Sequence, residues 1–273
     1  MLANMIKLDK KDRYWLEFLF AMTEKEIKAR YKHAVLGFLW VILNPILQMM
    51  AIGFVFQFFV PVNVDNYFLF LFSGLLPWNF FAYSISKNTP MIINERSLIQ
   101  KANFPRESII FSIILSNLFH FVISLLILIA LLVFDKVFIE SYSLIELSTY
   151  IMRMGFLIPF LIWLTLLVSG FSLFFSALNV KYRDVNFIVQ AIIPIWFYGT
   201  PVIYSIDLLP EVLRPFFYLN PMTAIIDGFH YSLLNQKFYS IDLLLLSFAI
   251  SLMIFFIGWK VFEKESKFFD DWV

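Results

Sequence analysis

The chain has 273 residues, of which 61% are hydrophobic and 20% aromatic, whereas only 15% are charged. A soluble domain carries about 25% charged residues, so much of this apolar surface must face lipid rather than water. The formal net charge of +1 gives no basic balance that would indicate nucleic-acid binding. The absence of cysteine excludes a disulfide framework, thiolate metal sites and a cysteine nucleophile.

The N-terminal segment, residues 1–33, is charged and precedes the first long apolar run. Within residues 9–22 the apolar side chains recur at i, i+3, i+4 and i+7, as Trp15, Phe18, Leu19 and Met22. This spacing predicts an amphipathic helix that anchors on the membrane surface or docks a cytoplasmic partner. Thr23 and Glu26 have capping-box spacing, so a second helix is expected to start there.

Six uncharged runs follow, and each is expected to span the membrane: residues 34–60, 66–86, 108–134, 154–180, 185–206 and 243–259. Crossing about 30 Å of hydrocarbon takes roughly 20 residues, a length that the first five runs reach. Six spans would leave 17 Lys and Arg residues on the side of both termini and four on the other side. The positive-inside rule therefore predicts that both termini are cytoplasmic.

Polar and helix-breaking residues occur inside several of these runs. Pro77 in the second run, and Pro194 and residues 198–201 in the fifth, predict breaks whose freed carbonyl groups need other partners. Two stripes of small polar residues lie on single faces of the third and fourth runs: Ser112, Ser116, His120 and Ser124, and Thr165, Ser169, Ser172 and Ser176. Such stripes either pack helices together or line a hydrophilic path.

The connection between the fifth and sixth runs, residues 207–240, contains a helix start at Asn220 and Pro221. Only about 14 residues remain before Asn235, which is too short to cross a bilayer. We expect a re-entrant half-helix that lines an outer vestibule. A simple outer amphipathic helix is the alternative.

Several kinds of chemistry find no support in the sequence. No charged residue lies in a span core, which disfavours ion coupling. No P-loop motif is present, so any ATP that drives the protein must bind to another chain. The three histidines do not have metal-ligand spacing. The external carboxylates Asp207, Glu211 and Asp227 are too scattered to favour an enzyme.

A series of short strings carries a family resemblance. The strings are Arg30-Tyr31, Leu36 to Trp40, Asn44-Pro45, Phe72 to Phe81, Leu98 to Lys101, Phe104 to Glu107, Asn179 to Asp184, Thr200 to Tyr204 and Leu219 to Met222. In this order, they resemble the permease subunit of ABC-2 type polysaccharide exporters, and the O-antigen, capsule and teichoic-acid branch more than the drug branch. The resemblance covers nearly the whole chain and divides it into an interface segment (1–33), a transmembrane domain (34–262) and a cytoplasmic tail (263–273).

The resemblance implies an all-α integral membrane protein with six transmembrane helices, an N-terminal amphipathic interface helix and re-entrant outer half-helices. It implies a homodimer in the cytoplasmic membrane of a bacterium or archaeon, bound to two separate ATPase subunits that hold ATP and magnesium. The cargo would be a polyprenyl-diphosphate-linked polysaccharide, and the chain itself would have no cofactor, metal or catalytic residue. The alternatives are a permease for a drug or lipid, and a membrane-embedded polyprenyl-linked glycosyltransferase.

The resemblance and the chemistry of the cargo also nominate site residues. The loops after the second and fourth spans would couple to the ATPase through Glu95, Arg96, Lys101, Arg106, Lys181, Arg183 and Asp184. Aromatic rings stack on sugars, and the candidates are Trp78, Phe81, Tyr83, Trp196, Tyr198 and Tyr204. Arg30, Lys32 and Arg96 are candidates for binding the diphosphate. Asn220, Pro221, Met222 and Phe229 would form an outer gate.

Overall fold

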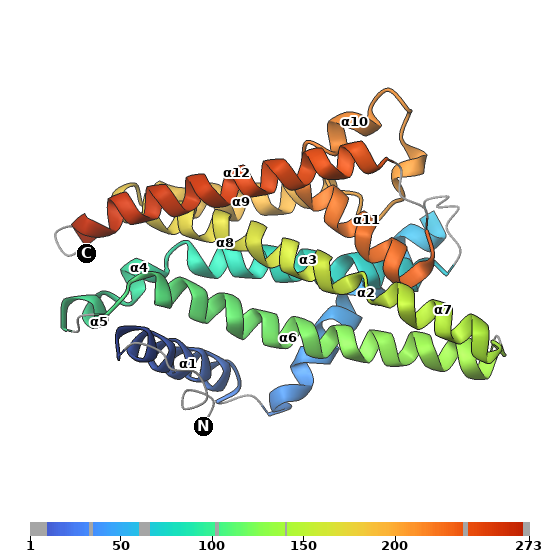
Figure 1. The fold of residues 1–273 in the computed structure, drawn as a ribbon, viewed down its shortest axis with the longest axis horizontal. Coiled ribbons are helices and arrows are strands. Elements are labelled where there is room, and N and C mark those ends of the chain that lie inside the picture. The colour runs from blue at the N-terminus through green and yellow to red at the C-terminus, as the bar shows by residue number, and fades with distance from the viewer. Residues whose placement is uncertain are drawn as a thin grey trace.

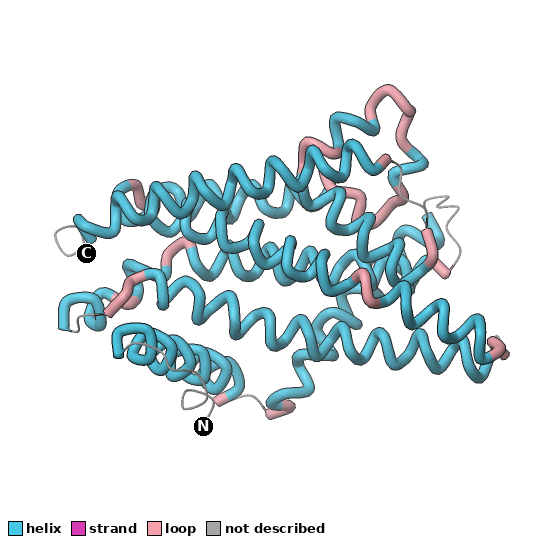
Figure 2. Tube along the Cα trace, in the orientation of Figure 1, coloured by secondary structure: helices cyan, strands magenta, loops and turns pink. Residues whose placement is uncertain are grey.

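The computed structural model describes residues 10–32, 35–59, 66–101, 104–139, 141–236 and 240–269. This part of the chain is almost entirely helical, with short connections (Figure 2), which confirms the expected all-α class. The longer helices are α1 (Lys10–Tyr31), α2 (Trp40–Phe59), α3 (Tyr67–Asn88), α6 (Glu107–Phe134), α7 (Leu144–Met154), α8 (Leu157–Lys181), α9 (Asp184–Tyr198), α11 (Pro221–Leu234) and α12 (Ile241–Glu265). The short ones are η2 (Gly37–Leu39), α4 (Met91–Asn94), α5 (Arg96–Lys101), η3 (Asp135–Ile139), η4 (Ile206–Leu208), α10 (Arg214–Phe217) and η5 (Ser266–Phe268).

Five helical segments are long and apolar enough to cross a membrane: Gly37–Phe56, Tyr67–Asn88, Glu107–Phe138, Leu144–Lys181 and Ile241–Phe268. They correspond to five of the six expected spans. The fifth expected span is the exception, because α9 has only 15 residues and ends at Tyr198. At 1.5 Å per residue it is about 22 Å long, which is less than the hydrocarbon thickness. The structure therefore has five membrane-length segments and one shorter apolar helix in its described part.

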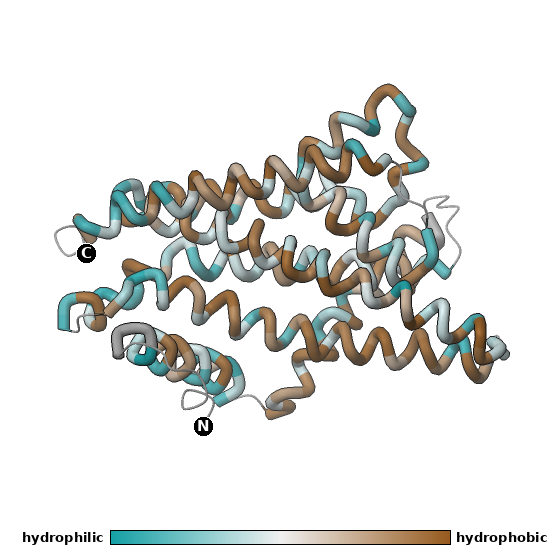
Figure 3. The backbone as a smooth tube through the Cα atoms, viewed as in Figure 1, coloured by the Kyte–Doolittle hydropathy of each residue, from teal (hydrophilic) through white to brown (hydrophobic). Residues whose placement is uncertain are grey.

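The helices form an elongated bundle with α3 in its interior (Figure 1). In the α3 span, 78% of the most apolar 18-residue stretch is buried. The corresponding share is 17% for the spans that contain α2 and α12, which lie at the periphery. The α4–α5 segment, the turn from α8 to α9 and the end of α12 gather at one end of the bundle, whereas the α6–α7 junction lies at the other. Hydrophilic residues concentrate at the ends and on α1, with hydrophobic helix between them (Figure 3).

Helix α7 was not among the expected elements, although the sequence contains its start signal. Ser143 and Glu146 form a capping box in which Ser143 Oγ accepts from the Glu146 amide at 3.4 Å, and Glu146 Oε2 accepts from the Ser143 amide at 2.9 Å. The helix prolongs the fourth span, so that helix continues with little interruption from Leu144 to Lys181. The α6–α7 junction consequently extends beyond the start of α12 (Figure 1).

Three of the expected helix breaks are absent from the structure. Helix α1 does not restart at Thr23, whose hydroxyl donates to the Leu19 carbonyl at 2.8 Å inside one continuous helix. Helix α3 likewise continues through Pro77. A proline removes only one backbone donor, and the tight burial of α3 outweighs that loss. In the fifth run Pro194 also lies inside a helix, and the chain leaves the helix only at Gly199.

Helix α11 begins as expected. The Asn220 side chain accepts from the Met222 amide at 3.1 Å, and Pro221 is the first helical residue. Twelve of its 14 residues are buried, so it is covered on all sides by the rest of the bundle. Burial around the whole circumference does not fit a simple amphipathic surface helix.

The peripheral helix α12 is held by a close crossing with α8. A Cβ atom built on Gly258 would lie 2.1 Å from the Gly170 carbonyl oxygen, and one on Gly170 would lie 2.7 Å from the Phe255 Cα. Trp163 Nε1 also donates to Ser251 Oγ at 2.6 Å across the same pair of helices. Small residues at such crossings let two backbones approach closely in lipid.

We expect Gly258→Ala to destabilise the protein by about 1–3 kcal/mol, because the methyl group collides with backbone that cannot rotate away. The measurement is thermal unfolding of the purified chain in detergent. Gly199→Ala is the matched control, since its Cβ would meet nothing closer than 3.6 Å. Equal melting temperatures for the two variants would contradict a tight α8–α12 crossing.

Candidate functional site

A cavity of about 500 Å³ lies between α1, α2, α3 and α6. We call it the Arg30 cavity. Its polar lining comprises Arg30, Tyr31, Asn44, Asn79, Tyr83, Asn117, His120 and Ser124, and its apolar lining comprises Trp40, Val41, Pro45, Leu76, Phe80 and Phe121. The volume falls in the range of small-ligand sites, and the mixture of apolar wall and a few polar groups is typical of them.

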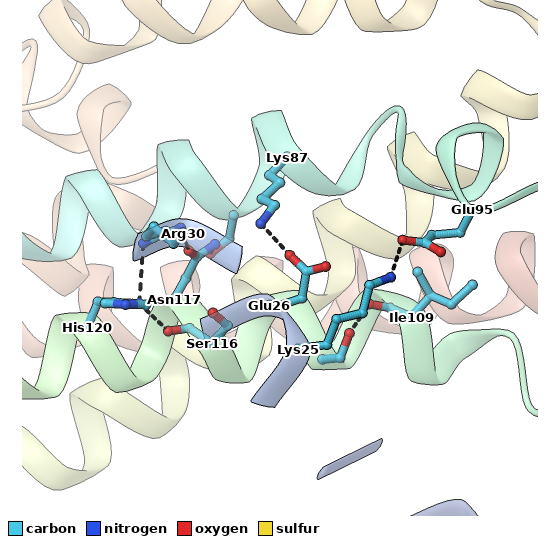
Figure 4. A network of polar contacts seen from close by, with 11 residues as sticks. Lys25, Glu26, Arg30, Lys87, Glu95, Ile109, Ser116, Asn117 and His120 are labelled. Carbon is cyan, nitrogen blue, oxygen red and sulfur yellow. Dashed lines mark hydrogen bonds and ion pairs between the residues drawn. The ribbon is translucent and has the colours of Figure 1, made fainter. Parts of the chain in front are cut away.

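Arg30 lies in the last turn of α1 and directs its guanidinium toward α6 (Figure 4). Its Nη2 donates to Asn117 Oδ1 at 2.5 Å, and Asn117 Nδ2 in turn donates to Ser84 Oγ on α3 at 3.1 Å. Arg30 is nevertheless exposed as a residue, so part of its donor fork is available to a ligand. A positive group fixed beside an open cavity favours an anionic ligand.

His120 is the titratable residue among those that line the Arg30 cavity from α6. Its Nδ1 lies 3.2 Å from Arg30 Nη1 and 2.5 Å from the Ser116 carbonyl oxygen. Only one of these contacts is a hydrogen bond at a time, because Nδ1 either carries a proton for the carbonyl or offers a lone pair to the guanidinium. The Nε2 atom is buried and has no hydrogen-bond partner among the described residues.

Further polar side chains face the same cavity from α1, α2 and α3. Burial raises the pKa of the Tyr31 phenol, against the opposing effect of Arg30, so the hydroxyl stays protonated and can donate. Asn44 Nδ2 lies 3.5 Å from the Tyr83 hydroxyl, which links α2 to α3. The site thus offers hydroxyl, amide and guanidinium groups to one ligand.

Helix α1 is fixed to the bundle by ionic and aromatic contacts. Lys87 on α3 donates to the buried Glu26 at 2.5 Å, and Lys25 donates to Glu95 between α4 and α5 at 2.7 Å (Figure 4). Phe18 stacks on Phe104 with 4.5 Å between ring centroids. Since Leu19 and Met22 are also buried, the apolar face of α1 packs on its own chain. Tyr14 and Phe20 of the same helix remain exposed, so the expected contact of α1 with the membrane surface or a partner stays a prediction.

Residues 17–234 match the family model described as ABC-2 type transporter. The chain belongs to the ABC-2 type transporter family. It is 31% identical over 265 residues to the O-antigen export system permease protein RfbA of Klebsiella pneumoniae, with 92% of this chain and 93% of that protein covered. It is 28% identical over 267 residues to the RfbA protein of Myxococcus xanthus, with 97% and 98% covered. The family resemblance seen in the sequence is confirmed.

The nominated coupling residues of this ABC-2 permease lie in two groups at the same end of the bundle (Figure 1). Arg96 and Lys101 are the exposed first and last residues of α5. Lys181, Arg183 and Asp184 are exposed at the turn from α8 to α9. Glu95 and Arg106 have intramolecular partners instead: Glu95 pairs with Lys25, while Arg106 donates to the Ser266 carbonyl and lies 6.0 Å from the Phe269 ring centroid.

The nominated aromatic residues of the permease divide by burial. Trp78 and Phe81 are buried in an aromatic cluster in which Phe81 meets the half-buried Trp196 edge-on at 5.1 Å. Tyr204 is half-buried and donates to the Tyr198 carbonyl at 3.0 Å. Tyr83 and Tyr198 are exposed, and Tyr83 alone of the six lines the Arg30 cavity.

The diphosphate candidates are likewise dispersed, whereas the gate candidates all belong to α11 or its cap. Of the three cations only Arg30 lines the cavity; Lys32 is exposed just beyond α1, and Arg96 lies on α5. Three gate residues, Asn220, Pro221 and Met222, are at the start of α11, where Asn220 Nδ2 donates to Thr200 Oγ1 at 2.8 Å, and Phe229 follows about two turns later. Met222 and Phe229 are fully buried there.

Sequence reasoning missed two partners in this site. Asn117 adjoins Ser116 in the polar stripe of α6, and that position was the available signal. Lys87 directly follows the second uncharged run, but nothing local indicates that it pairs with Glu26, 61 residues away. Both polar stripes have buried members, but only the stripe on α6 lines the Arg30 cavity, through His120 and Ser124.

We expect Lys87→Met to loosen α1, because it leaves the Glu26 carboxylate buried without its cation. Hydrogen exchange of the α1 amides in the purified permease should become at least tenfold faster. The double variant Glu26→Gln with Lys87→Met should recover part of that protection. Arg13→Gln is the control, since the Arg13–Glu17 pair is exposed and such pairs contribute little. Unchanged exchange in Lys87→Met would show that other contacts suffice to hold α1.

Proposed function

We propose that this chain is the membrane permease of an ATP-driven system that exports O-antigen or a related polyprenyl-diphosphate-linked polysaccharide. The observation that carries the proposal is the similarity to O-antigen export permeases of two genera over more than 90% of both chains. A local similarity could reflect a shared fold alone. Coverage of the whole permease, together with a polar cavity beside the membrane helices, supports a shared task.

The proposed topology has six crossings with both termini in the cytoplasm of a bacterial cell. Five are the membrane-length segments, and the sixth combines α9 with the turn that follows it, while α11 re-enters from the outside. Two observations support this arrangement. The α4–α5 segment, the α8–α9 turn and the end of α12 lie at one end (Figure 1), and these segments carry the excess of Lys and Arg.

The proposed assembly contains two copies of this chain and two ATPase subunits. The sequence has no P-loop, so ATP and magnesium would bind to the partner. The exposed charged residues of α5 (Arg96 and Lys101) and of the α8–α9 turn (Lys181, Arg183 and Asp184) would receive the motion of the ATPase. The outward side chains of α2 and α9 are apolar, as expected of helices that meet lipid or a second copy.

The Arg30 cavity is the proposed entry site for the lipid-linked head of the cargo. The guanidinium would bind the diphosphate, with Asn117 and His120 holding it in place. The exposed Tyr83 and Tyr198 would offer ring faces to sugars. The Lys25–Glu95 pair connects α1, which carries Arg30, to the α4–α5 segment that would face the ATPase. A movement of the α4–α5 segment would thus be transmitted through α1 to the head-group site.

The first test is purification of the tagged chain from its native membrane. We expect a P-loop ATPase at one copy per permease, and no ATP hydrolysis by the permease alone. Recovery of the chain without an ATPase, together with sugar transfer from a polyprenyl donor, would refute the export function and favour a glycosyltransferase. Stimulation of the complex by a drug, and not by lipid-linked glycan, would favour the drug-permease alternative.

The second test addresses the cavity. We expect Arg30→Gln to weaken binding of a polyprenyl-diphosphate glycan to the purified complex by about tenfold or more, as charged hydrogen bonds contribute about 1.5–3 kcal/mol. Arg30→Lys should retain part of the affinity because it keeps the charge. Lys28→Gln, an exposed change two residues earlier, should bind like the unaltered complex. Equal affinities across the three variants would remove Arg30 from the entry site.

A further inference from the structure

A second cavity, of about 570 Å³, lies at the end of the bundle opposite α4 and α5. We call it the Arg153 cavity. Its lining comes from the start of α3, the end of α6 with η3, α7, the segment around η4 and the end of α11. The described lining residues are Asn66, Leu69, Leu132, Asp135, Lys136, Tyr142, Tyr150, Arg153, Ser205, Asp207, Leu208, Leu233, Leu234, Asn235 and Gln236.

The lining is polar in a chain that is mostly apolar. Ten of the 15 residues have polar side chains, and five are leucines. The charged members are two acids, Asp135 and Asp207, and two cations, Lys136 and Arg153, so their formal charges cancel. A lining of this kind is poorly suited to an acyl chain and gives no net attraction to an anion.

Arg153 has a buried donor atom without a hydrogen-bond acceptor in the described part of the chain. Its Nε atom is buried and has no partner among the described residues, although buried donors nearly always have one. The guanidinium lies 5.2 Å from the Tyr150 ring centroid, and the Tyr150 hydroxyl donates to the Leu233 carbonyl at 2.9 Å. The ring and the guanidinium are therefore held in place between α7 and the end of α11. Because Arg153 lines the cavity, its guanidinium can donate to a ligand oxygen there.

Sugars match this set of groups. Each hydroxyl both donates and accepts, and the cavity offers acceptors in Asp135 and Asp207, donors in Arg153, and both in the amides of Asn235 and Gln236. Tyr142 adds an aromatic ring of the type that packs on pyranose C–H groups. The volume is within the range of sites for small ligands. We propose that the Arg153 cavity is a saccharide-binding site on the outward side of the protein.

The site would act on the glycan after it has crossed. Its walls include Leu233 and Leu234 at the end of α11 and the following Asn235 and Gln236, so a bound sugar would contact the C-terminal end of the helix that carries the proposed outer gate. The identification of this saccharide as the exported glycan rests on the function proposed above. The proposal that the cavity binds a saccharide does not depend on that function.

The test is saturation-transfer NMR with the purified full-length chain in detergent. The probe is the oligosaccharide released by mild acid from the surface polysaccharide of the cells that encode the chain. We expect binding that weakens at least tenfold in Arg153→Gln and in Asp207→Asn, the latter an exposed side chain whose change does not endanger folding. Lys28→Gln, on α1, should bind like the unaltered chain. Absence of binding, or equal binding by all four proteins, would overturn the proposal.

Two further readouts separate the possible failures. Glycerophosphoethanolamine is the second probe, and its binding in place of the oligosaccharide would assign the cavity to a lipid head group and overturn the saccharide site. Export of the glycan is measured in cells that carry the unaltered chain. Export without oligosaccharide binding refutes only the cavity proposal. Oligosaccharide binding without export refutes only the proposed function.

Discussion

The placement of α1 depends on one buried carboxylate. Glu26 is buried, and an ionised side chain is costly there unless a cation pairs with it. Lys87, at the end of α3, supplies that cation and so fixes the register of α1 against the bundle. Arg30 follows one helical turn later and meets Asn117 and His120 on α6. The charged wall of the Arg30 cavity therefore follows from the Glu26–Lys87 pair.

Much of the fold could be predicted from the sequence because membrane helices are long and uncharged. Five expected spans agree with membrane-length helices, and the Asn220 cap fixed the start of α11. The break expected at residues 198–201 coincides with the end of α9 at Tyr198, whereas the uncharged run, which continues to residue 206, predicted a span longer than the helix. The continuity of α3 through Pro77 could not be predicted from the second uncharged run either, because tertiary burial decides whether the helix continues at that proline.

The site was less predictable than the fold, and the reason is physical. Periodicity shows that α1 has an apolar face but not what covers it, and here Phe104 and α6 do so. Likewise, an aromatic residue beside a predicted break looks the same whether it is buried, as Trp78 and Phe81 are, or exposed, as Tyr83 is. Arg30 was identified by its charge and depth. Its partners on α6 come from 87 and 90 residues away, a distance at which local patterns carry no information.

Helix α3 relates the two polar cavities to each other. Its 22 residues span about 33 Å. It lines the Arg153 cavity with Leu69 and with Asn66, which directly precedes it, and the Arg30 cavity with residues between Leu76 and Tyr83. Because α3 is continuous through Pro77 and closely packed, it can move only as a unit with its neighbours. A displacement that begins at α4, which directly follows α3, would alter the walls of both cavities together. An export cycle in which one cavity admits a head group while the other releases sugar would need this kind of rigid connection.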